Sequence, residues 1–154
     1  MSADDRLKEL GFELPPAPKA VGVYKPAVTV GNVVYTSGHL PLLPDGTLLK
    51  GCVGKDVDQQ AGYEAAQHAA LNLFATLKSH VGSLDKVERV VKLFGMVYSA
   101  PDFIQHPGVI NGCSELFVKV FGEEKGAGSR SAFGVAALPL GAIVEIEGIF
   151  ELKA

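Results

Sequence analysis

Few side chains in this sequence have the chemistry of a reactive site, and the first that stands out is a cation near the end of the chain. Arg130 lies in a β-rich run, residues 130–138. The residues that share its face of this run are all small: Ala132, Gly134 and Ala136. In the next run, residues 143–152, Glu145 and Glu147 share a face. A cation beside small residues leaves a shallow space for a ligand, but the pattern also suits an exposed edge arginine and a solvated acidic face.

The cysteines and histidines lack the spacing of a metal site or of a disulfide framework. Cys52 lies in a glycine-rich loop, whereas Cys113 lies on the apolar stripe of a predicted helix. This position makes Cys113 a buried small hydrophobe rather than a nucleophile. Three histidines have no partner at ligand spacing and are interpreted as surface residues: His68, His80 and His106. We therefore expect no metal and no role for the thiols.

Length, composition and charge exclude several classes of protein. The chain has 154 residues, of which 47% are hydrophobic and 20% charged, so it can bury the core of one domain. The formal net charge is −3, which gives no general attraction to phosphates or anionic membranes. No run of about 18 apolar residues is present, and the polar first residues lack a signal-peptide apolar region. We expect a cytoplasmic protein with no nucleic-acid or membrane partner.

Three strands are predicted before the run that holds Arg130. Residues 27–30 and 33–37 flank a turn signal at Gly31-Asn32, which predicts a first hairpin. The apolar residues of the segment Val87–Tyr98 predict a third strand. Prolines and glycines between Leu40 and Gly54 indicate a long loop, with a small turn at Asp45-Gly46.

Two amphipathic helices are predicted between these strands. We expect Asp56 to cap the first helix with Gln59 as its capping-box partner, and Gly82 to end it. Its apolar stripe recurs at helical spacing: Ala66, Ala70, Leu73, Phe74, Leu77 and Val81. The second helix is expected to begin near Pro101 or Asp102. Its stripe contains Val109, Cys113, Leu116, Phe117 and Val120.

The order of elements, β-β-α-β-α-β-β, predicts an α+β fold in which both helices cover one face of a mixed sheet. Residues 1–154 form one domain in this prediction, with residues 1–16 as an N-terminal extension and residues 17–152 as the folded unit. The runs 130–138 and 143–152 are separated by four residues that include Pro139 and Gly141, which predicts an antiparallel hairpin. Arg130, Glu145 and Glu147 are expected on the uncovered face, which should meet other subunits.

Several segments, in this order and spacing, resemble the Rid (YjgF) family of reactive-intermediate deaminases, once catalogued as endoribonuclease L-PSP. They are Val21-Gly22-Val23-Tyr24, Thr36-Ser37-Gly38, Asn111 to Phe117, Arg130-Ser131, Leu138-Pro139 and Val144-Glu145-Ile146-Glu147. The resemblance runs from about Ala17 to Leu152. It implies a chorismate-mutase-like fold, in which a mixed sheet is backed by two helices, and a homotrimer with ligand sites between subunits.

The resemblance also implies an activity. Members of the family hydrolyse reactive 2-imino acids and their enamine tautomers to 2-keto acids and ammonia, as 2-iminobutanoate/2-iminopropanoate deaminases without a cofactor. The family's hallmark arginine matches Arg130, which would bind the substrate carboxylate. Its acidic water-orienting residue matches Glu145, and its site tyrosine matches Tyr24. The substrate-binding positions match Ser37, Gly38 and Asn111.

The sequence departs from the family at two of the site positions. Ala132 stands where a cysteine is common, so only a backbone carbonyl could hold a water there. His39 stands where glutamine is frequent, and it either contacts the ligand or simply ends a strand. The loop from Pro41 to Gly54 and the N-terminal extension are longer than in compact members. The chain therefore resembles a longer, divergent branch whose carboxylate substrate stays open.

Two other classes of function fit the same residues. A non-catalytic protein could use the Arg130 pocket to bind a carboxylate metabolite. An RNA-cleaving inhibitor of translation is suggested by the older family name, although the acidic balance and the lack of a basic-aromatic patch oppose nucleic-acid binding.

The predicted hairpin leads to a prediction about assembly. If Leu138 pairs with Ile143, Glu145 lies opposite Ala136, and Arg130 lies roughly 20 Å further along. The two side chains then cannot share a site within one hairpin. If both serve one pocket they come from neighbouring chains, which predicts a closed homotrimer with three equivalent sites.

Overall fold

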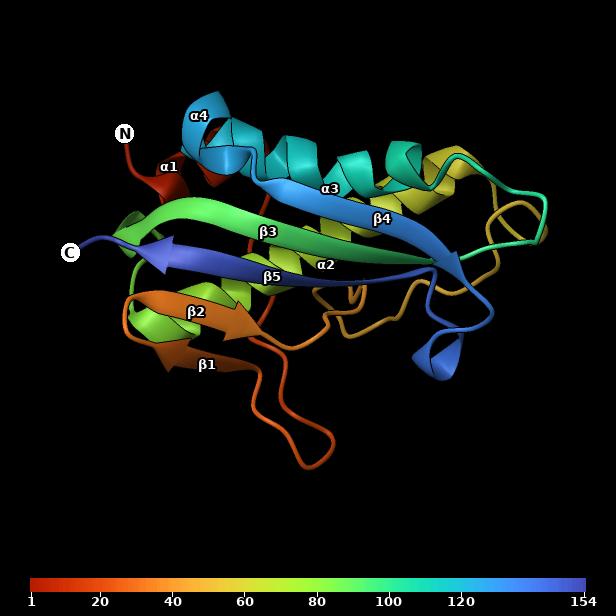
Figure 1. Cartoon of the computed structure of the whole chain (residues 1–154), viewed down its shortest axis with the longest axis horizontal. Helices are drawn as coiled ribbons and strands as arrows, with labels where there is room; N and C mark the ends of the chain where they lie inside the picture. The colour runs from red at the N-terminus through yellow and green to blue at the C-terminus, as the bar shows by residue number, and fades with distance from the viewer.

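The sheet has five strands, and its order differs from the order of the strands along the chain. The computed structural model describes all residues from Met1 to Ala154. The strands are β1 (Ala27–Val30), β2 (Val33–Thr36), β3 (Val87–Tyr98), β4 (Ser129–Val135) and β5 (Val144–Leu152). Their order across the sheet is β1-β2-β5-β3-β4 (Figure 1). Only β3 and β4 are parallel, so the sheet is mixed, as predicted.

Two long helices, α2 (Gln59–Val81) and α3 (His106–Phe121), pack against each other and against the same face of the sheet (Figure 1). Their apolar stripes, with alternate residues of the strands, form one core in which Phe74, Phe117 and Phe150 are fully buried. The predicted α+β layering is therefore confirmed. None of the helices is long and apolar enough to span a bilayer.

The helix starts differ from the prediction because local capping chemistry decided them. Asp58, not Asp56, is the N-cap of α2, and its side chain accepts a hydrogen bond from the backbone N of Ala61 at 2.8 Å. The Asp56 carboxylate accepts instead from the backbone N of Cys52. Helix α3 begins at His106, later than the predicted start at Pro101 or Asp102, and has a proline in its first turn.

The predicted hairpin between the last two runs is wrong, because β3 lies between β4 and β5. Helix α3 connects β3 to β4, so β4 lies parallel to β3 at the edge of the sheet, as a strand–helix–strand crossover allows. Strand β5 then occupies the space between β2 and β3 and pairs antiparallel with both. The connection between β4 and β5 contains the short 3-10 helix η2 (Pro139–Gly141).

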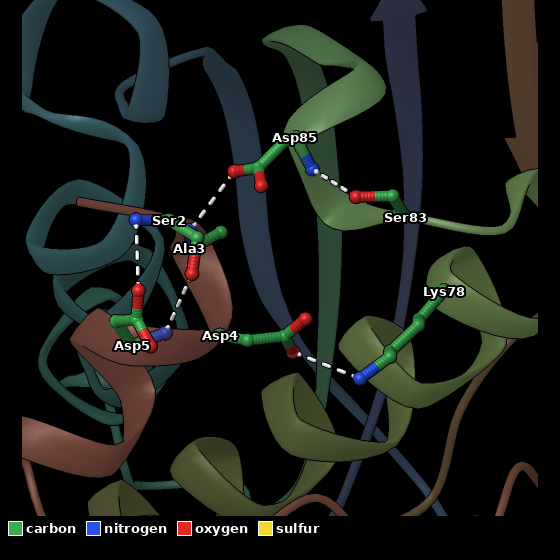
Figure 2. A network of polar contacts seen from close by, with 7 residues as sticks. All are labelled: Ser2, Ala3, Asp4, Asp5, Lys78, Ser83 and Asp85. Carbon is green, nitrogen blue, oxygen red and sulfur yellow. Dashed lines mark hydrogen bonds and ion pairs between the residues drawn. The ribbon is translucent and has the colours of Figure 1, made fainter.

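The N-terminal helix α1 (Ala3–Glu9) is bound to the rest of the fold by several polar contacts (Figure 2). Ser2 and Asp5 form a capping box at its start. The backbone N of Ala3 donates to the Asp85 carboxylate at 2.9 Å, and Asp4 forms an ion pair with Lys78 of α2 at 3.1 Å. These contacts fix the segment predicted as an N-terminal extension against the ends of the helices.

The long loop after β2 folds into a small hairpin around Asp45-Gly46, the turn that the sequence predicts. Leu42 and Leu48 face each other in an antiparallel bridge, and the backbone N of Leu43 donates to the Thr47 carbonyl at 2.8 Å. The Asn72 side chain of α2 donates to the Leu42 carbonyl at 2.9 Å. The loop is therefore attached to the first helix.

Candidate functional site

Gly38 and Glu145 are brought into contact at the end of β2, on the face of the sheet opposite the helices. A Cβ atom added to Gly38 would lie 2.7 Å from the carboxyl carbon of Glu145. Glycine is therefore required for the carboxyl group to occupy this position. The next residue, His39, pairs with Ile146 through two backbone hydrogen bonds of 2.8 and 3.0 Å, which fixes the register of this contact.

Tyr24 and Ser37 lie beside the same glycine. The Ser37 hydroxyl donates to the Lys25 carbonyl at 2.6 Å, which ties the segment before β1 to the end of β2. This segment projects from the sheet (Figure 1), and the Tyr24 hydroxyl within it accepts from the backbone N of Val21 at 3.4 Å. A cavity of about 280 Å³ borders Tyr24, Ser37 and Gly38. Four predicted site residues, Tyr24, Ser37, Gly38 and His39, thus border one small cavity next to Glu145.

The Glu145 carboxyl group is set up for proton exchange by its surroundings. Its burial, and secondly the charge of Glu147 on the same face of β5, raise the pKa of Glu145 above its usual range. A half-buried carboxyl group with a raised pKa is a candidate for general acid–base chemistry or for the orientation of a water.

The side chain of His39 is directed into the protein. Its Nδ1 contacts the Ser37 carbonyl oxygen and its Nε2 contacts the Thr76 hydroxyl, both at 2.7 Å. Because a carbonyl can only accept, Nδ1 carries the proton and Nε2 accepts from Thr76. Burial lowers the pKa of His39, which favours this neutral form. Both ring nitrogens of His39 are therefore occupied, although the residue also lines the cavity, and its contact with a ligand stays a prediction.

Arg130 lies elsewhere, at the opposite edge of the sheet, and faces helix α3. Its Nη1 donates to the Asn111 side-chain oxygen at 2.8 Å and to the Ser114 hydroxyl at 3.1 Å. A guanidinium group has five N–H donors. The two on Nη1 are engaged, while those on Nε and Nη2 have no partner within the chain. Asn111 and Ser114 therefore hold one side of the guanidinium and leave the other side free for a planar anion such as a carboxylate.

The expectation that Arg130 lies on the uncovered face is wrong. It pairs with Leu93 of β3, whose side chain is buried under the helices, and parallel neighbours at one level share a face. Two of the small residues that follow it are closely packed by other parts of the chain. Ala132 packs against the core, and a Cβ on Gly134 would lie 2.5 Å from His106 and 2.6 Å from Ser99.

The two groups of residues cannot meet within one chain. Arg130 lies level with Leu93 and Glu145 with Met96, on the two strands that flank β3. They are therefore separated by about 10 Å across the sheet and about 10 Å along it. Their side chains also leave opposite faces of the sheet. The predicted pairing of Glu145 opposite Ala136 is wrong, because β4 and β5 are not neighbours.

The remaining reactive side chains are dispersed. Both cysteines are buried, and burial strongly raises the pKa of the Cys113 thiol, as expected for a core residue. His80 contacts Thr29 at 2.7 Å, and His106 contacts Ser99 at 3.0 Å. The structure contains no group of three or more histidine, cysteine or acidic residues that could hold a metal ion.

Two functional candidates emerge only from the structure. Ser114 contacts Arg130, and its position three residues after Asn111 on a helix is the signal that could have identified it. Leu140 lines the cavity beside Gly38 from the connection between β4 and β5. No pattern in the sequence indicates this position, because the path of the connection depends on the strand order.

Known proteins match this chain over almost its whole length. Residues 4–152 match the family described as "YjgF/chorismate_mutase-like, putative endoribonuclease". The chain is 40% identical to Protein TCP17 of Trypanosoma cruzi over 147 residues, which are 96% of this chain and 92% of that protein. It is 32% identical to a 2-iminobutanoate/2-iminopropanoate deaminase of Dermatophagoides farinae over 140 residues, 90% of this chain and 93% of that one.

The fold is also similar to solved structures. The crystal structure of a "putative endoribonuclease" from Shewanella oneidensis superposes with a TM-score of 0.94 at 33% sequence identity. The superposition covers 99% of this chain and all of the other. The profile match, the sequence relatives and the shared fold agree with one another. The chain belongs to the YjgF/chorismate mutase-like family.

Proposed function

We propose that the protein is a cofactor-independent deaminase that hydrolyses 2-imino acids to 2-keto acids and ammonia, at sites formed between neighbouring copies of the chain. The observation that carries this proposal is the division of the site. Tyr24, Ser37, Gly38 and Glu145 form one half and Arg130 with Asn111 forms the other, on opposite faces of the sheet. A ring of identical subunits places the first half of one chain against the second half of the next.

The reaction adds water across the C=N bond. A water molecule attacks C2 of the 2-iminium acid and loses a proton, which gives a tetrahedral carbinolamine. The amine then takes up that proton, the hydroxyl group gives up its own proton, and the C–N bond breaks as ammonia leaves and the C=O bond of the 2-keto acid forms. These steps need a clamp for the carboxylate, a positioned water, and a group that accepts and returns a proton.

The proposed roles follow from the surroundings of each group. Arg130 binds the carboxylate through its free Nε and Nη2 donors, because Asn111 and Ser114 occupy Nη1. Glu145 of the neighbouring chain orients the attacking water and carries its proton to the leaving nitrogen. The 32% identity to a protein named as a 2-iminobutanoate/2-iminopropanoate deaminase supports the same reaction.

The first test is an assay of ammonia release from freshly generated 2-imino acids. Arg130→Ala should lower kcat/KM by about a hundredfold, since a bidentate clamp makes two charge-assisted hydrogen bonds of about 1.5–3 kcal/mol each. Arg130→Lys should rescue only part, because a point charge cannot reproduce the planar fork. Arg89→Ala, at an exposed arginine of β3, is the matched control and should leave the rate unchanged.

A complementation experiment tests the division of the site between chains. Arg130→Ala and Glu145→Gln chains should each retain only a small residual activity as homogeneous proteins. Co-expressed in equal amounts, they should recover about a quarter of the parent activity, because about one interface in four joins an intact Arg130 to an intact Glu145. Light scattering should give three times the mass of one chain for the parent and for each variant.

Three results would contradict the proposal. Undiminished activity of Arg130→Ala would show that another residue binds the carboxylate. If Lys19→Ala then lost activity, Lys19, the one charged residue of the cavity lining, would be that residue. Activity that is not restored by mixing the two variants would place the site within one chain. A parent protein that binds 2-keto acids through Arg130 but hydrolyses no imino acid would be a binding protein for carboxylate metabolites.

A further inference from the structure

The cavity beside Gly38 has a lining that imine hydrolysis alone does not require. Four leucines line it: Leu40, Leu42, Leu48 and Leu140. Lys19 is the only charged side chain in the lining. A small cavity that is mostly apolar, with a few polar groups at one side, has the composition of a pocket for an organic ligand. Its polar side chains include those of Tyr24 and Ser37, which with Gly38 belong to the proposed active site.

Leu140, which lines the cavity, has a backbone conformation that is unfavourable for leucine. It is the only residue other than glycine with a positive φ, with φ 59° and ψ 14°. A leucine is destabilised in this left-handed region, because its Cβ approaches the following carbonyl oxygen. Its side chain is also 76% exposed, so it contributes little to the core. Glycine or asparagine would suit the turn better, and strained residues of this kind concentrate at functional sites.

The wall that faces Leu140 is fixed in place from two sides. Asn72 of α2 is buried and donates to the Leu42 carbonyl at 2.9 Å. The backbone N of Ile143 donates to the Leu49 carbonyl at 3.1 Å, which joins the small hairpin to the connection that carries Leu140. The leucines therefore belong to a preformed wall rather than to a mobile loop.

The geometry points to this cavity as the subsite for the substrate side chain, and it favours 2-imino acids with a large apolar side chain over those with a methyl group. This inference rests on the proposed function. The carboxylate is bound by Arg130 of the neighbouring chain and C2 lies near Glu145, so the side chain extends past Gly38 toward the leucines. A methyl group would leave most of these apolar side chains without a contact.

The test compares two substrates that differ only in the side chain. Imino acids are generated in place from leucine and from alanine by an amino-acid oxidase with catalase. We expect kcat/KM for the leucine-derived acid to exceed that for the alanine-derived acid by about tenfold or more, as additional buried methylene groups allow. In a second readout, which needs no catalysis, 4-methyl-2-oxopentanoate should bind more tightly than pyruvate in a calorimeter.

Leu140→Asn is the decisive variant, because asparagine tolerates the left-handed backbone but presents a polar side chain. The ratio of the two kcat/KM values should fall about tenfold, while the melting temperature stays the same or rises. Ile104→Asn is the matched control, since Ile104 is exposed to a similar degree, 75%, and lies outside the cavity lining. It should keep the parent ratio.

The outcomes separate this inference from the proposed function. If both imino acids are hydrolysed equally well, the subsite is overturned and the deaminase stands. A second outcome is that no imino acid is hydrolysed, 4-methyl-2-oxopentanoate binds more tightly than pyruvate, and Leu140→Asn removes this difference in affinity. The subsite then stands and the deaminase is overturned. If Leu140→Asn dissociates the assembly and abolishes hydrolysis of both imino acids, Leu140 serves an interface and the inference is wrong.

Discussion

At the scale of single residues, the site depends on a missing side chain as much as on charged ones. Gly38 lets the Glu145 carboxyl group lie against the backbone at the end of β2. The three atoms that a Cβ would meet, at 2.7 to 2.9 Å, all belong to the flexible side chain of Glu145. Glu145 can therefore move aside without disturbing the backbone, but it then leaves the position proposed for it.

This predicts that Gly38→Ala separates activity from stability. The variant should lower kcat by about tenfold or more, while the free energy of unfolding falls by no more than about 1 kcal/mol. Gly108→Ala is the control, because its Cβ would also meet the end of one flexible side chain, that of Gln59. Rates and thermal melts of both variants decide the outcome, and full activity of Gly38→Ala would argue against Glu145 as the water-binding group.

The pH dependence gives a second prediction at this scale. Burial and then Glu147 raise the pKa of Glu145, and the proposed role needs the ionised form. The rate should fall as the pH drops through this raised pKa, and Glu147→Gln should move the acidic limb of the profile to lower pH. Glu145→Gln should abolish the limb. Equal limbs in the parent and in Glu147→Gln would assign the titration to another group.

Stability should follow the opposite trend with pH. A glutamate whose pKa is raised in the folded state binds its proton more tightly there than in the unfolded chain. Its contribution to stability is thus fully present below the unfolded pKa and is lost as the pH rises through the folded pKa. In the window between the two values, the protein gives up stability as it gains the ionised carboxylate.

The identities of several site residues could be anticipated from the sequence, but their neighbours could not. Tyr24, Ser37 and Gly38 were expected together, and they do border one cavity. The fate of His39 depended on Thr76, a residue 37 positions away that supplies its second hydrogen bond. Such a contact depends on how α2 lies over the sheet, and no local pattern encodes it.

At the scale of elements, the position of α3 relative to α2 sets the position of the arginine. Gly112 of α3 packs so closely on α2 that a Cβ would lie 2.1 Å from the Tyr63 carbonyl oxygen. Asn111, the next residue back along α3, contacts Arg130. Any displacement of α3 away from α2 therefore moves the contact that holds the guanidinium.

Gly112→Ala should accordingly damage both stability and activity. The added methyl group meets backbone rather than a flexible side chain, so the two helices must separate. We expect a loss of about 3 kcal/mol in the free energy of unfolding, at the upper end of the usual cost of overpacking. The loss in kcat/KM should appear mainly as a higher KM. Lys119→Ala, at an exposed position of the same helix, should change neither quantity, and denaturant titrations would compare the two.

The sequence predicted the elements well and one of their pairings badly. The predicted strand Val87–Tyr98 has the bounds of β3, and both helix stripes are buried, because residue periodicity reports which face of an element is covered. The predicted hairpin failed since two β runs joined by a Pro-Gly segment are compatible with adjacent or separated strands. Pairing across a sheet depends on every other strand, and β3 binds β4 and β5 on its two edges.

At the scale of the whole molecule, the two halves of the site can act on one substrate only if neighbouring chains bring them together. The expectation that Arg130 and Glu145 cannot meet within one chain holds, but for a different reason from the one the sequence suggested. Distance along a hairpin played no part. Their side chains leave opposite faces of the sheet, on the two strands that flank β3. The homotrimer stays a prediction: light scattering measures the number of chains, and the complementation experiment tests whether they share the site.

The central place of β5 has a consequence for how the protein is made. The last strand of the chain, Val144–Leu152, lies between β2 and β3 and is the only element that joins the pair β1-β2 to the pair β3-β4. During synthesis the ribosome must therefore release residues 144–152 before the two partial sheets can combine. Until then each partial sheet exposes an unpaired edge, which is a template for aggregation. We therefore expect chaperones to protect the unpaired strand edges of the nascent chain until β5 has left the ribosome.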